Sequence, residues 1–133
     1  MELSSPAPRK LLHTRKVECR GYTREDGLWD IEGSLQDLKT YPFENSWRGL
    51  VEVDDPVHEM IIRLTVDDRL NIKKAEAFTS KSPYAICPSA AWAFSQLEGL
   101  RIKGGWMKLV KERYGGAKGC THLMEMLYPV GTT

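Results

Sequence analysis

The chain has 133 residues, of which 41% are hydrophobic and 28% are charged, a balance typical of one soluble folded domain. The 19 basic and 18 acidic residues leave a net charge of +1, so no overall attraction to nucleic acid or to an acidic membrane is expected. Three cysteines are too few for a secreted disulfide framework, no apolar run is long enough to span a membrane, and the first residues lack a signal-peptide pattern. We therefore expect a small, soluble, cytoplasmic domain, and the composition does not indicate what it does.

The chain divides into a short tail and one domain. Residues 1–16 are expected to form a flexible tail, because prolines and serines alternate there with isolated basic residues. A single domain is expected over residues 17–133. Its first half, from residue 17 to residue 78, has a hydrophobic period of two, which predicts strands.

Two of these strands have a clear pattern. Over residues 29–36, apolar residues and glycine alternate with acidic and polar ones, as in a strand that is buried on one face. A second strand, over residues 57–66, is expected to bury the face that holds His58, Met60, Ile62, Leu64 and Val66. A turn at residues 67–69 and a returning strand over residues 70–79 predict an antiparallel hairpin.

The pattern changes to helical spacing after Ser80. Helices are expected over residues 89–98, 106–114 and 121–128, each ended by a glycine or a proline. An antiparallel sheet followed by about three helices predicts an α+β sandwich with the helices packed on one face.

Four potential metal ligands each stand where an element is expected to begin. Outside the tail and the first strand, the histidines and cysteines of the chain are His58, Cys87, Cys120 and His122. Two thiolates and two imidazoles suit a tetrahedral zinc or ferrous ion. Junctions between loops and elements gather at one end of such a sandwich, so the four residues predict a mononuclear Zn or Fe site. A purely structural role for each stays open, because buried cysteines often only pack against their neighbours.

Three further residues are candidates for catalysis. Glu59 adjoins His58 and is the first choice for a general base or for a partner of the imidazole. Asp30 is a second carboxylate on the polar face of a strand. Tyr84, or alternatively Trp106, is expected at the rim of a pocket beside the metal.

Four sequence motifs resemble a bacterial family known only as a domain of unknown function. They occur in order over most of residues 17–128, as Arg24–Gly33, Pro56–Met60, Pro83-Tyr84-x-x-Cys87 and Gly119–Leu123. The resemblance implies a bacterial protein and brings no activity with it.

The order of elements is also similar to the iron–sulfur cluster scaffold family. In that family three cysteines, with an aspartate and a histidine nearby, hold zinc or a nascent cluster at one end of a sheet–helix sandwich. Cys87 matches the middle cysteine and Cys120 the last one, whereas Val57-His58-Glu59 replaces the first. The resemblance implies this fold and a metal site, and the larger share of imidazole favours a mononuclear metal over a cluster.

Three functions are compatible with these residues. In the first, which we prefer, the four ligands or three of them hold a metal with an open position, for lysis or hydrolysis of a small molecule such as an aromatic compound. In the second, the protein is an iron–sulfur or sulfur-transfer scaffold, with the sulfur on Cys120, whose thiol follows Gly119 at an expected helix start. In the third, the metal is structural and the protein only binds. The oligomeric state stays open, and a homo-oligomer is compatible with the sequence.

Overall fold

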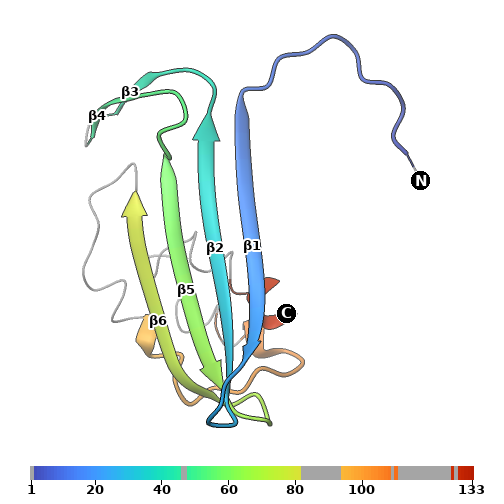
Figure 1. Ribbon diagram of the computed structural model, residues 1–133, viewed down its shortest axis with the longest axis vertical. Helices are drawn as coiled ribbons and strands as arrows, with labels where there is room; N and C mark the ends of the chain where they lie inside the picture. The colour runs from blue at the N-terminus through green and yellow to red at the C-terminus, as the bar shows by residue number, and fades with distance from the viewer. Residues whose placement is uncertain (1, 46–47, 82–93, 109, 111–126, 128) are drawn as a thin grey trace.

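A four-stranded antiparallel sheet dominates the computed structural model of the protein (Figure 1). The structure describes residues 2–45, 48–81, 94–108, 110, 127 and 129–133. The main sheet has the strand order β1-β2-β5-β6, and β3 and β4 pair in a separate two-stranded ribbon. The strands are β1 (His13–Thr23), β2 (Trp29–Lys39), β3 (Phe43–Asn45), β4 (Gly49–Val51), β5 (His58–Val66) and β6 (Ile72–Lys81).

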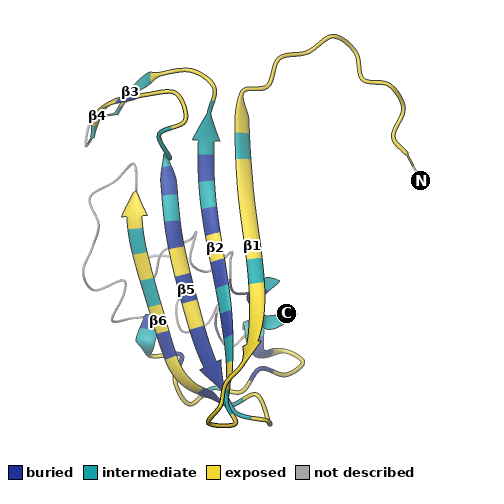
Figure 2. Ribbon diagram, in the orientation of Figure 1, coloured by how far each residue is buried: buried dark blue, intermediate teal, exposed yellow. Residues whose placement is uncertain are grey.

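The main sheet is buried on one face, which we call the inner face. Strand β5 directs its even-numbered residues, from His58 to Val66, to this face, and all of them are buried, as the alternating sequence predicts. On β2, Ile31 and Leu35 are buried on the same face, and Figure 2 shows the alternation along both strands. The predicted hairpin is confirmed, since β5 pairs antiparallel with β6 across the turn at Asp67.

Residues from the second part of the chain close the core against the inner face. They are Phe94, Leu97, Ile102, Trp106, Val110, Leu127 and Val130. Trp106 packs so closely against Gly131 that a Cβ added there would come within 2.6 Å of the indole ring. Trp106 is therefore a core residue, 7% exposed, and does not form the rim of a pocket.

The expected sandwich with about three helices is wrong, and with it the architecture implied by the iron–sulfur scaffold resemblance. Of the described residues, 49% lie in strands and 10% are helical, in only two short helices. Turns replace the end of the first expected helix, because the amide of Gly99 bonds to the carbonyl of Ile72 at the start of β6. Just beyond, the amide of Ile102 bonds to the carbonyl of Leu70 in the β5–β6 turn. Much of the three expected helices, at residues 89–93, 111–114 and 121–126, lies outside the described residues.

Strand β1 begins inside the segment expected to be a tail over residues 1–16. It pairs with β2 in a register that runs from His13 opposite Lys39 to Thr23 opposite Trp29. The chain before it runs away from the sheet (Figure 1). Within the part of the chain that is described, no helix is long and apolar enough to cross a membrane.

Candidate functional site

A row of polar side chains crosses three strands at one end of the inner face. Arg15 on β1 lies opposite Asp37 on β2, and Asp37 lies opposite His58 on β5. Directly opposed residues in an antiparallel sheet point to the same face, so the three side chains are neighbours. His13 lies two positions before Arg15 and adds a second imidazole. We call these four residues the Asp37 cluster.

The carboxylate of Asp37 is the centre of this cluster. Its side chain is 3% exposed, and Arg15 donates hydrogen bonds to its two oxygens, from Nε at 2.7 Å and from Nη2 at 2.9 Å. Nδ1 of His58 lies 3.2 Å from Oδ2, and Nε2 of His13 lies 3.4 Å from Oδ1. The backbone carbonyl of Asp37 accepts a hydrogen bond from the amide of Val57 at 2.8 Å, which fixes the chain just before β5.

The charge state of Asp37 follows from two opposing effects. Burial raises the pKa of a carboxyl group because it disfavours the charged form. Here the hydrogen bonds and the charge of Arg15, together with the imidazoles of His13 and His58, outweigh burial and hold the pKa of Asp37 below its usual range. Asp37 is therefore ionised at neutral pH and acts only as an acceptor.

A carboxylate beside Nδ1 determines which ring nitrogen of His58 is basic. Nδ1 carries the proton that points at Asp37, so in the neutral ring the basic lone pair lies on Nε2. A histidine held in this way suits metal ligation or general-base catalysis, since both need a fixed ring and a defined tautomer.

Glu59 lies on the opposite face of the sheet from His58, because neighbouring residues of a strand point to opposite sides. Its carboxylate accepts hydrogen bonds from Nε2 of Gln36 at 3.0 Å and from the hydroxyl of Ser80 at 3.1 Å. The structure does not bring Glu59 to the imidazole. The carboxylate next to His58 is that of Asp37.

Asp30 lies at the other end of the sheet. It is paired with Thr65 near the end of β5, about 23 Å from Asp37 along β2 at roughly 3.3 Å per residue. Its Oδ1 accepts hydrogen bonds from the Thr65 hydroxyl at 2.8 Å and from Nη1 of Arg24 at 3.3 Å. Asp30 and His58 therefore do not belong to one site.

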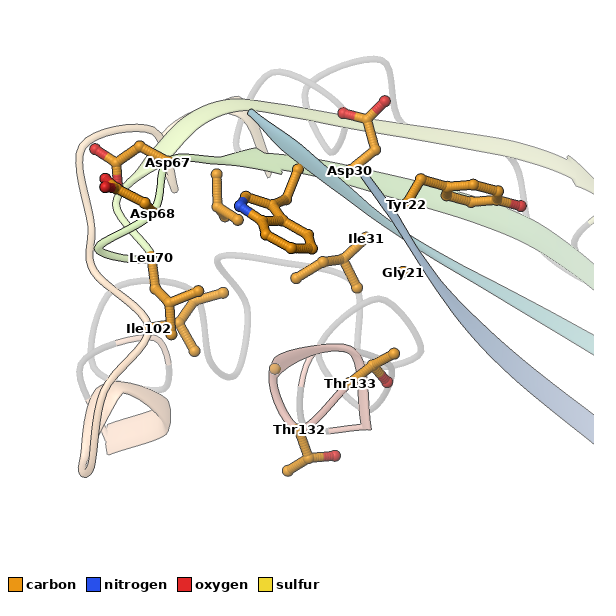
Figure 3. Close-up of a pocket in the computed structure, with 13 residues that line it drawn as sticks. Gly21, Tyr22, Asp30, Ile31, Asp67, Asp68, Leu70, Ile102, Thr132 and Thr133 are labelled. Atoms are coloured by element: carbon orange, nitrogen blue, oxygen red, sulfur yellow. The ribbon is translucent and has the colours of Figure 1, made fainter. Parts of the chain in front are cut away.

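A pocket of about 790 Å³ occupies the Asp30 end of the sheet (Figure 3). Its walls include Tyr22 and Ile31 from β1 and β2, Leu70 from the β5–β6 turn, and Thr133. In Figure 3 the side chain of Asp30 extends away from Ile31 and from the interior of the pocket. The pocket and the Asp37 cluster are separate features at opposite ends of the sheet.

The remaining predicted site residues, Tyr84, Cys87, Cys120 and His122, lie outside the described residues. Of the four expected metal ligands, the structure thus places His58. Among the described side chains, no three His, Cys, Asp or Glu residues are arranged to hold a metal ion.

The sequence pattern does not single out Asp37, Arg15 or His13. A signal for Asp37 was present. The residues at positions 31, 33 and 35 alternate toward the inner face, and Asp37 is the next residue in that series. An acidic residue at a position that the pattern assigns to the core calls for a partner. His13 and Arg15 stood in the expected tail, where the pattern gives no sign of pairing.

A family model described as "Protein of unknown function (DUF2889)" matches residues 13–133. The chain belongs to this family. The match begins at His13, so the whole Asp37 cluster lies within the DUF2889 domain. No curated protein and no solved structure matches the chain, and the similarity to the iron–sulfur scaffold family is not confirmed.

Proposed function

We propose that this DUF2889 protein is a metal-dependent enzyme of the bacterial cytoplasm that catalyses lysis or hydrolysis of a small molecule, with His58 as one ligand of a zinc or ferrous ion. The observation that carries this proposal is the 3.2 Å contact between Nδ1 of His58 and the buried carboxylate of Asp37. Metal-binding histidines commonly donate their second ring N–H to a carboxylate, which fixes the ring and raises the basicity of the ligating nitrogen.

The donor chemistry fits such an ion. His58 offers an imidazole nitrogen, and Cys87, Cys120 and His122 are the nitrogen and sulfur donors that the sequence provides for the same ion. When bound, the ion supplies a Lewis acid that polarises a substrate oxygen.

The chain's own residues prepare His58 for this role. Asp37 holds the imidazole at a fixed rotation and keeps the proton on Nδ1, which is the task that the sequence suggested for Glu59. Arg15 keeps Asp37 ionised through two hydrogen bonds. The side chain of His13 is 47% exposed, so this imidazole lies where the cluster meets solvent.

Metal analysis of untagged protein tests this function. Wild-type protein purified without a metal-affinity column should hold about one equivalent of zinc or iron by plasma mass spectrometry. His58→Ala should lose most of this metal, because a ligand is removed. Asp37→Asn should weaken metal affinity about 10–100-fold in competition with a chelating dye, because the orienting partner is lost. Glu59→Gln is the matched control on the opposite face and should bind metal like the wild type.

Three other outcomes of these measurements would argue against a metal-dependent enzyme. Wild-type protein that neither contains a metal nor takes up added zinc or ferrous ion would rule out the metal site. A persulfide that accumulates on Cys120 in the presence of a sulfur donor would favour the sulfur carrier. A cobalt-substituted protein whose visible spectrum is insensitive to added small anions would favour a closed structural site.

A further inference from the structure

Strand β1 forms one edge of the four-stranded sheet in the described part of the chain. Of its residues, Thr14 and Cys19 are partly buried and the others are exposed, as the yellow strand in Figure 2 shows. A long exposed edge strand presents a row of backbone amides and carbonyls that can pair with another strand. The side chains of β1 determine which partner strand pairs best with this edge.

The pairing of β1 with β2 shows which backbone groups point outward. The amide of Thr40 donates to the carbonyl of Leu12 at 3.1 Å, and the amide of Arg24 donates to the carbonyl of Leu28 at 2.9 Å. In the register of this hairpin, even-numbered residues of β1 therefore direct their backbone groups toward β2. Odd-numbered residues, including Val17 and Cys19, direct theirs to the outer edge.

Large apolar side chains are exposed along this edge. Val17 points to the inner face, yet it is 45% exposed in the part of the chain that the structure describes. Leu11, Leu12 and Tyr22 are also exposed, at 62%, 54% and 41%. Burial of such side chains on association is favourable.

The charges and the apolar side chains of β1 together favour one pairing of this strand with itself. When two copies pair antiparallel about a two-fold axis at Val17, Lys16 of each copy lies opposite Glu18 of the other, and Leu12 lies opposite Tyr22. The two valines then meet on the inner face, and their outward backbone groups pair directly.

Neighbouring registers are poorer. An axis at Glu18 places Lys16 opposite Arg20 of the other copy, twice, and like charges in directly opposed positions are destabilising. An axis at Cys19 places Glu18 opposite Arg20, but these two residues already form an ion pair within the strand. The same axis places Val17 opposite Gly21, so the exposed valine gains little cover.

We propose that the protein is a two-fold symmetric dimer in which β1 pairs antiparallel with β1 of a second copy, centred on Val17. The pairing joins the two four-stranded sheets into one continuous sheet. His13 of one protomer then lies opposite Gly21 of the other, which lines the pocket. The Asp37 cluster of each protomer thus adjoins the pocket end of its partner. This inference is independent of the proposed metal.

The oligomeric state of the full chain tests the dimer. Wild-type protein should sediment as a dimer in analytical ultracentrifugation, and Val17→Lys should be a monomer, because two lysines meet at the axis. Ile61→Lys is the control, since Ile61 is 50% exposed on the outer face of β5, and this variant should stay dimeric. Wild-type protein that is monomeric at all concentrations, or an Ile61→Lys effect as large as that of Val17→Lys, would refute the proposal.

Charge exchange tests the register. Lys16→Glu and Glu18→Lys should each raise the dimer dissociation constant about tenfold, because each places two like-charged pairs opposite one another. The double variant Lys16→Glu/Glu18→Lys should restore wild-type dissociation, because it exchanges the two charges. A double variant as weak as the single ones would contradict this register.

A disulfide gives a second measurement that does not depend on affinity. Residues in a hydrogen-bonded antiparallel pair have Cα atoms about 5.5 Å apart, which is within the range of a disulfide. Val17→Cys, made together with Cys19→Ser, should form a covalent dimer under mild oxidation, with the link at position 17 identified by mass spectrometry. The absence of this link under conditions where the protein is dimeric would show that another surface holds the dimer.

Discussion

At the scale of the residue, Asp37 depends on partners from two neighbouring strands. Its carboxylate has little contact with solvent, so Arg15, His13 and His58 take the place of water. A buried charge is tolerated only when it is paired and hydrogen-bonded, and the loss of one partner leaves the others without compensation. The cluster is thus both a candidate for chemistry and part of what holds β1 to β2.

The substitution Asp37→Asn should lower the free energy of unfolding by about 1–3 kcal/mol, because hydrogen bonds to a charged buried group are lost. Arg15 is 41% exposed, so the loss should be smaller than for a fully buried pair. Urea unfolding of the metal-free protein measures this value. Glu32→Gln is the control, since Glu32 pairs with Arg63 at 2.7 Å on the outer face, and it should cost less than about 1 kcal/mol. Equal losses would mean that burial adds nothing at Asp37.

At the scale of the element, β5 connects the candidate site to the core. It lies between β2 and β6, and its inner face runs from His58 at one end to Val66 at the other. The same strand carries polar side chains on its outer face, where Arg63 pairs with Glu32. One strand therefore separates a buried layer from a solvated one.

Two adjacent isoleucines of β5 test this division. Ile62 is fully buried and Ile61 is 50% exposed on the other face. Ile62→Ala should cost about 2–5 kcal/mol of unfolding free energy, because it removes buried methyl groups and leaves a cavity. Ile61→Ala should cost less than about 1 kcal/mol. Similar losses for the two variants in urea unfolding would show that the faces of β5 are assigned incorrectly.

At the scale of the whole molecule, the two ends of the sheet differ in chemistry but share a dependence on ionised carboxylates. Asp37 serves the cluster at one end. At the other end, hydrogen bonds from the side chain and the amide of Asn71 lower the pKa of Asp67 to about 2 and hold the β5–β6 turn. Both groups have a folded-state pKa below the value near 3.9 expected in the unfolded chain.

The sign of the pH dependence follows from these shifts. The unfolded chain binds protons more readily than the folded one, so the stabilisation is complete above about pH 4 and is lost as the pH falls through the folded-state pKa. The urea midpoint of metal-free protein should therefore be steady from about pH 5 to 7 and fall toward pH 2. The double variant Asp37→Asn/Asp67→Asn should show a smaller fall. If its decline matched that of the wild type, other groups would be responsible.

The alternation of side chains along the chain was sufficient to predict the strands over residues 29–36 and 57–66, the buried face of β5 and the antiparallel hairpin. The reason is local, since a strand sends successive side chains to opposite faces whatever its neighbours are. The end of the first expected helix failed for a related reason. The apolar spacing just after residue 94 is equally satisfied by turns, and the bonds from Gly99 to Ile72 of β6 and from Ile102 to Leu70 of the β5–β6 turn decide between the two.

The contacts of the Asp37 cluster were decided by the tertiary structure alone. Arg15 lies 22 residues before Asp37 in the chain, and they meet because β2 pairs with both β1 and β5 in one particular register. The same register gives His58 a carboxylate partner in Asp37, while Glu59, its neighbour in sequence, points to the other face. Spacing along the chain predicts which face of a strand a side chain lies on. Strand pairing depends on contacts between segments that are distant in the sequence, and a local pattern does not predict these contacts.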